Sequence, residues 1–166
     1  MNKLDITLSN SIKIVYKRIE KMSNCIMKKL NCPHCGNSME VLLWDSINAQ
    51  ISPIAREDLL RGKIHTTECP NCKKTFSVDK TILYHDMAKQ ILVWYFPFTN
   101  LEHSSFYGPF SADGRLNVNI GIEEDEVPEY AKNPHYVFTA TEMIRYIKFR
   151  EKLADIKKGN AAWGTK

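Results

Sequence analysis

The sequence predicts an α+β protein in which a zinc-ribbon-like antiparallel β-sheet carries two cysteine knuckles, with a short inserted helix and a helix at each end. Three observations predict this fold: two Cys-Pro-x-Cys motifs, a series of short β-branched and aromatic segments, and an amphipathic periodicity near each terminus. The chain has 166 residues, of which 43% are hydrophobic, so we expect one domain with an apolar core of its own.

Composition also bears on location and partners. No segment approaches the roughly 20 consecutive apolar residues that a membrane-spanning helix needs. The N-terminal residues include lysines but lack the continuous apolar stretch of a secretory signal. We therefore expect a cytoplasmic protein with no membrane partner.

The net charge of +4 is unevenly distributed. Residues 1–31 carry seven lysines and arginines against two acids, residues 141–166 carry seven against three, and the segment between them is net acidic. Two basic ends around an acidic centre are compatible with a nucleic-acid footprint. Solvent-exposed helix faces are also often rich in lysine, which is the simpler interpretation.

The first element predicted is an N-terminal helix. Apolar residues recur at spacings of three and four between residues 11 and 29, and the remaining positions are largely basic. We interpret residues 1–30 as an amphipathic extension, residues 31–158 as the zinc-binding domain and residues 159–166 as a flexible tail. Cys25 is then an ordinary helix residue.

Between the two motifs, residues 39–45 are predicted as a strand and residues 54–61 as a short helix. Pro53 precedes that helix and Gly62 follows it, which is the polarity expected at the two ends of a helix. Residues 64–68 are expected to be extended and to lead into the second motif.

Beyond the second motif, strands are predicted over residues 75–78, 81–85 and 90–98. Residues 91–96 are apolar at every position, which is typical of a central strand covered on both faces. An Asp-Gly pair at 113–114 predicts a hairpin between strands at 106–111 and 116–122, followed by an exposed loop over 123–134. A capping box at 139–142 begins a final helix, which is expected to end at Gly159.

The strongest chemical signal is the set of four cysteines at Cys32, Cys35, Cys69 and Cys72. A C-x2-C turn places two thiolates at adjacent corners of a tetrahedron, and two such turns complete a closed zinc site. Such a site leaves no position for water or substrate. We therefore expect one structural Zn²⁺ per chain.

Three alternatives to a zinc site remain open for these cysteines. A disulfide scaffold fits poorly with a cytoplasmic protein that has an unpaired fifth cysteine. Redox catalysis by Cys-Pro-His-Cys needs a long helix that begins within the motif, whereas Gly36 follows it directly. Four buried thiols without metal would not be expected to fall in two matched turns.

The order of these motifs resembles the CpXC domain family of bacteria and archaea. The resemblance rests on the segments CPHCG, WDSINA, LLRG, CPNC and LYHD, the last before a strand that ends at Pro97, and it covers about residues 31–158. The family is regarded as a presumed zinc-binding domain without an established activity. The resemblance implies that the four cysteines are ligands, and Lys73 departs from the glycine found at the matching place in the first knuckle.

Catalytic chemistry beyond the metal has one candidate pair, His85-Asp86. A histidine beside an acid can orient a proton-transfer group. Neighbouring residues on a strand point to opposite faces, however, and an aspartate at a hairpin turn commonly forms hydrogen bonds to the turn itself. We assign no catalytic and no cofactor-binding residues.

The sequence therefore supports three hypotheses of function. The first is a zinc-stabilised binding or adaptor domain that acts through protein–protein recognition, either with an unidentified protein or by self-association. The alternative is a zinc-ribbon protein that binds nucleic acid through its basic terminal helices. The third is an enzyme that uses His85 or Asp86.

Overall fold

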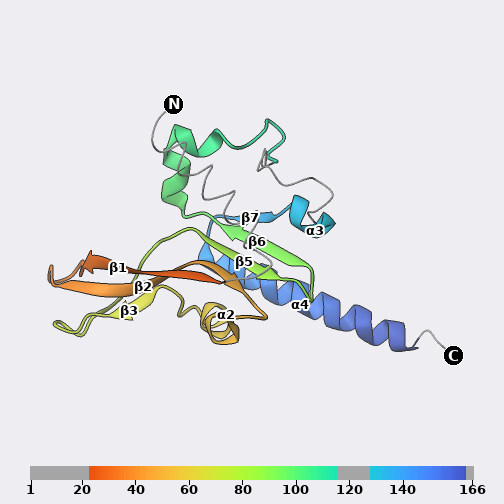
Figure 1. Ribbon diagram of the computed structural model, residues 1–166, viewed down its shortest axis with the longest axis horizontal. Coiled ribbons are helices and arrows are strands. Elements are labelled where there is room, and N and C mark those ends of the chain that lie inside the picture. The colour runs from red at the N-terminus through yellow and green to blue at the C-terminus, as the bar shows by residue number, and fades with distance from the viewer. Residues whose placement is uncertain (1–22, 116–127, 164–166) are drawn as a thin grey trace.

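The computed structural model describes residues 23–115 and 128–163, with side chains up to Gly159. Its elements are β1 (Asn24–Asn31), β2 (Ser38–Asn48), α2 (Pro53–Leu60), β3 (Thr66–Glu68), β4 (Thr75–Ser77), β5 (Ile82–Asp86), β6 (Ile91–Tyr95), the 3-10 turns η1 (Phe98–Glu102) and η2 (Ser104–Tyr107), α3 (Glu129–Lys132), β7 (His135–Val137) and α4 (Ala140–Trp163). The α+β class predicted from the sequence is confirmed (Figure 1).

The main sheet has five strands in the order β1-β2-β5-β6-β7, and β3 with β4 forms a separate two-stranded ribbon. The prediction of an antiparallel sheet is wrong in part, because β2 is parallel to β5 and β6 is parallel to β7. Parallel neighbours need a long crossover connection. One crossover contains α2 and the ribbon, and the other contains η1, η2 and α3.

The predicted N-terminal helix is wrong over residues 24–29, which belong to strand β1. This strand pairs antiparallel with β2 along its whole length, from Asn24 opposite Ser46 to Asn31 opposite Ser38. The helical spacing of its apolar residues is overridden because the Cys32 turn brings β2 directly alongside. The rest of the predicted helix, residues 11–22, lies outside the described residues.

Three further predictions need correction in the second half of the chain. Residues 106–111 were predicted as a strand, but they form none and begin in η2. Their predicted partner strand at 116–122 lies outside the described residues, and so do residues 123–127 of the expected loop. A turn does form before Gly114, whose N–H donates to Ser111 O at 2.9 Å. The short elements α3 and β7 were not predicted, and α4 continues through Gly159 to Trp163.

The apolar core covers both faces of the central strands. Every residue of β5 and β6 is buried, which confirms the prediction that residues 91–96 form a covered central strand. On one face, side chains of α2 and α4 pack against the sheet; this cluster includes Ala55, Leu59, Met143, Ile147, Tyr84 and Val93. On the other face, an aromatic cluster includes Trp94, Phe96 and Phe106, with Phe110 and Tyr136 packed against it.

The two ends of the molecule differ in construction (Figure 1). Strand β5 pairs with β2 only from Ser46 to Asn48, so the rest of the β1–β2 hairpin extends beyond the central strands. We call β1, residues 32–45 and residues 66–77 the cysteine arm, and β5, β6, β7, α2 and α4 the body. At the opposite end α4 projects past the sheet. None of the helices in the described part of the chain has the length and apolarity needed to cross a membrane.

Candidate metal centre

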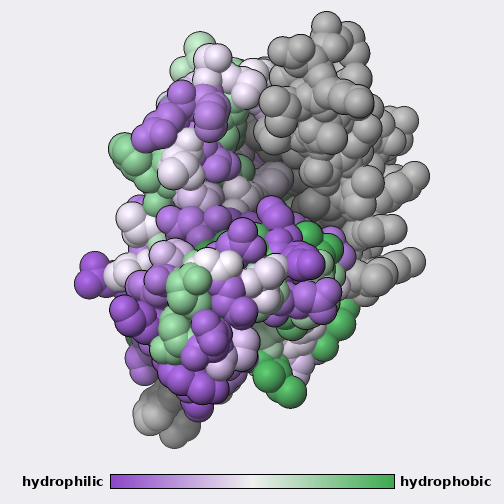
Figure 2. Space-filling model, turned by 90° about the vertical axis from the view of Figure 1, so that its left-hand side faces the viewer, coloured by the Kyte–Doolittle hydropathy of each residue, from purple (hydrophilic) through white to green (hydrophobic). Residues whose placement is uncertain are grey.

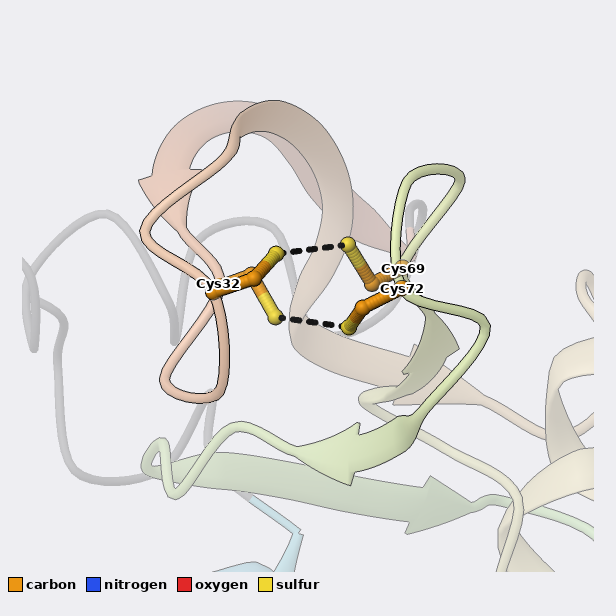
Figure 3. A group of neighbouring side chains, drawn as sticks. Cys32, Cys69 and Cys72 are labelled. Atoms are coloured by element: carbon orange, nitrogen blue, oxygen red, sulfur yellow. Dashed lines mark hydrogen bonds between the residues drawn. The ribbon is translucent and has the colours of Figure 1, made fainter.

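Each pair of cysteines lies in the loop of its own hairpin. Cys32 and Cys35 lie between β1 and β2, and Cys69 and Cys72 lie between β3 and β4. Although far apart in the sequence, the two loops face each other across a short gap, and the cysteine side chains project into it (Figure 3). The prediction that the four cysteines come together is confirmed.

The two knuckles share one backbone geometry. In the first, the N–H of Gly36 donates to Cys32 O at 2.9 Å, and in the second the N–H of Lys73 donates to Cys69 O at 2.9 Å. Both donors have a positive φ, 73° for Gly36 and 59° for Lys73. Lys73 therefore occupies a left-handed conformation that glycine, the residue at the matching place in the first knuckle, adopts more readily.

The sulfur positions fit a tetrahedral metal. The Sγ atoms of Cys32 and Cys72 are 3.8 Å apart, those of Cys35 and Cys69 are 3.7 Å apart, and all four lie within 4.8 Å of one another. Four sulfurs that each bind zinc at about 2.3 Å lie about 3.8 Å apart at tetrahedral angles. The donor set therefore suits Zn²⁺ in type, number and spacing.

Electrostatics at the cluster favour a cation. The N–H of Asn37 and the side-chain amide of Asn71 lower the pKa of Cys35 to about 6. The N–H of Lys74 lowers the pKa of Cys72, but burial and the neighbouring thiols outweigh it and raise that pKa to about 11. Neighbouring thiolates repel one another, so a divalent cation would allow all four to ionise together.

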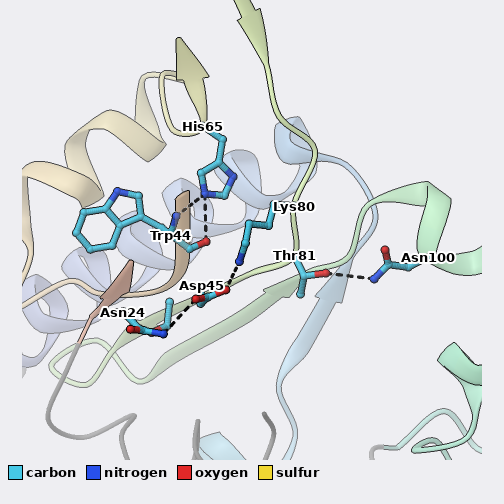
Figure 4. A network of polar contacts seen from close by, with 8 residues as sticks. Asn24, Trp44, Asp45, His65, Lys80, Thr81 and Asn100 are labelled. Atoms are coloured by element: carbon cyan, nitrogen blue, oxygen red, sulfur yellow. Dashed lines mark hydrogen bonds and ion pairs between the residues drawn. The ribbon is translucent and has the colours of Figure 1, made fainter. Parts of the chain in front are cut away.

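A polar network attaches the second hairpin to the first (Figure 4). His65, which is buried just before β3, accepts a hydrogen bond from the N–H of Trp44 at its Nε2 (2.9 Å). Lys80, which follows β4, forms an ion pair with Asp45 on β2, and Asn24 Nδ2 donates to the same carboxylate at 3.1 Å. These contacts fix the second knuckle relative to the first at a distance from the sulfurs.

Two supporting residues were not predicted from the sequence. Asn71 Nδ2 donates to Cys35 Sγ across the gap between the knuckles, at 3.6 Å. Its place immediately before Cys72 was a usable signal, because an amide inside a knuckle can reach a thiolate. His65 has no such signal, since its partner is the backbone of Trp44, 21 residues away.

The residues of the candidate catalytic pair contact different parts of the structure. His85 and Asp86 are both buried, and His85 Nε2 lies 2.7 Å from Tyr130 Oη. Asp86 Oδ1 accepts hydrogen bonds from Gln50 Nε2 at 2.7 Å and from the N–H of Lys89 at 3.0 Å. Asp86 thus organises the β5–β6 turn, as the structural interpretation predicted.

The remaining histidines and Cys25 lie apart from the sulfur cluster. His34 is exposed in the first knuckle, His103 is exposed between η1 and η2, and the ring of His135 stacks on Tyr146 at a centroid distance of 3.7 Å. Cys25 is exposed on β1, not on the helix that was expected. Within residues 23–115 and 128–163, the four cysteines are the only group of potential ligands placed to hold a metal ion.

Comparison with known proteins agrees with these features. Residues 30–160 match the CpXC protein family. Because that match spans most of the sequence and includes both cysteine pairs, the chain belongs to this family. The chain has no significant match among curated proteins or among solved structures.

Proposed function

We propose that this member of the CpXC family is a zinc-stabilised binding module that acts through protein–protein recognition. Cys32, Cys35, Cys69 and Cys72 would hold one structural Zn²⁺. The observation that carries the proposal is the closed arrangement of four sulfurs between two hairpin loops. A tetrahedral ion with four thiolate ligands has no open position for substrate, so the metal would stabilise the arm instead of reacting.

The arrangement of the two knuckles supports a zinc-ribbon-like interpretation of the arm. Each ligand pair sits in a hairpin loop, and the two hairpins belong to different sheets. A metal would therefore link two small β units in which strands β1, β3 and β4 contain no buried residue, although Val41 and Leu43 of β2 are buried. In such units metal binding contributes directly to folding.

Surface chemistry supports recognition of a protein. Large apolar side chains are exposed on the arm at Ile26, Met27 and Leu42, and Met27 lies opposite Leu42 in the β1–β2 register. Seen from this end, the surface is mostly hydrophilic with separate hydrophobic areas (Figure 2). Mixed polar and apolar surfaces of this kind are typical of non-obligate protein interfaces.

Nucleic-acid binding is the second candidate, and helix α4 favours it. Five of its exposed residues are basic: Arg145, Lys148, Lys152, Lys157 and Lys158. Binding through phosphate contacts would weaken steeply as salt concentration rises, because counterions are released. Binding to an apolar protein surface would depend much less on salt.

Two measurements test the proposal. Elemental analysis of the purified chain is expected to give about one zinc per molecule. A pull-down at low salt from cells that produce the protein, with and without nuclease, is expected to recover the same protein partner in both samples. Recovery that disappears with nuclease would support the second candidate, and a chain free of zinc would refute the metal-stabilised module.

A cytoplasmic location remains a prediction, which fractionation of the same cells would check.

A further inference from the structure

Strand β1 is an edge strand with an open side. It comes first in the sheet order and pairs only with β2 among the described strands. In an antiparallel pair every second residue directs its N–H and C=O away from the partner strand. No hydrogen bond within the described residues reaches that outer side of β1. Within that part of the chain, the eight residues of β1 therefore present a row of unpaired backbone groups at the edge of the arm.

The side chains of β1 combine charge with apolar surface. Lys28 and Lys29 are exposed, and neither forms an ion pair within the described part of the chain. Beside them Met27 is 59% exposed and Ile26 is 43% exposed. Successive residues of a strand point to opposite faces, so each face of β1 presents one lysine and one apolar side chain close together.

We propose that the outer edge of β1 binds an extended, acidic segment of a partner protein by adding it to the sheet as a further strand. Main-chain hydrogen bonds would provide much of the affinity, and the side chains beside the edge would provide selectivity. Acidic residues would meet Lys28 and Lys29, and apolar residues would cover Ile26 and Met27. This inference rests on the proposed function and specifies its binding surface and partner chemistry.

Charge distinguishes this occupant from a second copy of the chain. Two β1 strands side by side would bring four lysines together, and like charges across neighbouring strands are destabilising. Lysines on an edge strand are a known device against such self-pairing. The same charges attract a strand that carries glutamate or aspartate, so they select an acidic partner instead of abolishing pairing.

The metal centre has a role in this recognition. Cys32 follows directly after Asn31, the last residue of β1, so a metal bound there would fix one end of the strand. At the other end, Asn24 is held by Asp45 and by Ser46, whose Oγ accepts a hydrogen bond from the Asn24 N–H at 3.1 Å. A strand held at both ends loses less conformational entropy when another strand docks on it.

The test uses the full zinc-loaded chain and a fluorescent octapeptide in which valines and threonines flank two adjacent glutamates. Fluorescence anisotropy is expected to show binding that depends on the main chain. A copy of the peptide with alternate amides N-methylated cannot form the backbone hydrogen bonds between strands and is expected to lose binding. A copy with lysines in place of the glutamates is expected to bind at least about tenfold more weakly, because like charges would then meet across the edge.

A pair of matched protein variants locates the site. The double variant Lys28→Glu with Lys29→Glu is expected to weaken peptide binding about tenfold or more through charge reversal at the edge. Lys157→Glu with Lys158→Glu makes the same charge change on exposed residues of α4, at the other end of the molecule, and is expected to change affinity less than about twofold. Zinc content and circular dichroism of both variants verify that the fold is kept.

The outcomes separate this inference from the proposed function. Equal binding of the N-methylated peptide, equal weakening by both double variants, or no peptide binding at all would overturn strand addition at β1. A concentration-dependent dimer cross-linked through β1 would also overturn it, in favour of a second copy. If zinc is present and a protein partner is captured through another surface, only the β1 inference fails. If zinc is absent, the proposed function fails whatever the peptide does.

Discussion

The cysteine arm and the body of this protein are stabilised by different physics. In the body, two clusters of buried side chains cover both faces of β5 and β6. In the arm, every residue of β1 except Leu30 is exposed, the two ribbon strands contain no buried residue, and Val41 and Leu43 of β2 are buried apolar side chains. Four clustered thiols and a polar network connect the two hairpins of the arm.

This difference shows why a chain with an adequate core would still be stabilised by a metal ion held between its four cysteines. Apolar burial of the body offers little to two hairpins that lie beyond it, because hydrophobic stabilisation scales with the apolar area removed from water. Zinc would supply a local cross-link in that region. The arm can then keep exposed main-chain edges and charged side chains, which a buried element cannot.

The largest expected effect is loss of the metal centre. Cys69→Ser removes a buried thiol from the proposed zinc site, so zinc content should fall from the expected value of about one per chain to near zero. Hydrogen exchange should then accelerate in β1, β3 and β4, while β5 and β6 keep their protection. The matched control is Cys25→Ser, which alters an exposed thiol outside the cluster and should leave both measurements unchanged.

Removing the metal with a strong chelator tests the same difference between the arm and the body without a substitution. It is expected to loosen the arm and to lower the thermal midpoint of the wild-type chain, because a ligand that binds only the native state stabilises it. A chain that still unfolds cooperatively at an unchanged midpoint in chelator would show that the site is incidental to the fold.

The second effect addresses the body. Ile147 on α4 is fully buried in the cluster that joins the helix to the sheet. Ile147→Ala should therefore reduce the free energy of unfolding by about 3 kcal/mol, through lost burial and a residual cavity. On the same helix, Ile156 is 48% exposed, and Ile156→Ala should cost less than about 1 kcal/mol. Denaturant titration measures both, and equal losses would contradict the assignment of this core.

The third effect lies at the junction of arm and body and depends on pH. Burial, followed by the nearby charge of Lys80, lowers the pKa of His65 below its ordinary value of 6.5. His65 therefore binds a proton at a higher pH in the unfolded chain than in the folded chain. This contribution to stability should be complete above about pH 6.5 and should decline as the pH falls from there through the folded-state pKa.

His65→Gln isolates that contribution, because glutamine keeps a side-chain acceptor but does not titrate. We expect a loss of about 1 kcal/mol at neutral pH from imperfect geometry at the Trp44 N–H. We also expect a shallower fall in stability below pH 6.5 than in the wild-type chain. Acid release of zinc affects both proteins, so the difference between their unfolding curves reports on His65 alone. Parallel curves would refute the role assigned to this histidine.

The smallest effects come from the two matched knuckle positions. Gly36 and Lys73 both have a positive φ, which costs a residue with a side chain about 1 kcal/mol. Gly36→Ala should therefore lower the thermal midpoint of the zinc-loaded protein, and Lys73→Gly should raise it slightly. A lower midpoint for both variants would show that the side chain of Lys73 stabilises the protein by more than its backbone strain costs.

Local patterns in the sequence were sufficient wherever neighbours in the chain decide the structure. Pro53 and Gly62 bracket α2 as predicted, and Gly62 takes the positive φ of 71° expected after a helix end. The continuous apolar run at 91–96 predicted a strand buried on both faces. The two Cys-Pro-x-Cys motifs predicted that the four cysteines lie together, because two C-x2-C turns can complete one tetrahedral metal site.

Other features depended on partners that are distant in the sequence. Residues 24–29 have helical spacing, but they form a strand because β2 lies alongside them. The parallel pairings of β2 with β5 and of β6 with β7 depend on how the crossovers pack, which local periodicity does not report. Gly159 lies within α4 because its missing side chain weakens a helix without ending one.

By itself, then, the sequence determined the chemistry of this protein: two thiol pairs suited to zinc, an apolar central strand, and the turns that surround them. Each of these depends on residue type and short-range spacing, which the sequence states directly. The tertiary structure alone decided that Lys28 and Lys29 stand on an open edge of the described sheet, next to the first knuckle. An edge is defined by which strands lie side by side, and only the folded chain shows that arrangement.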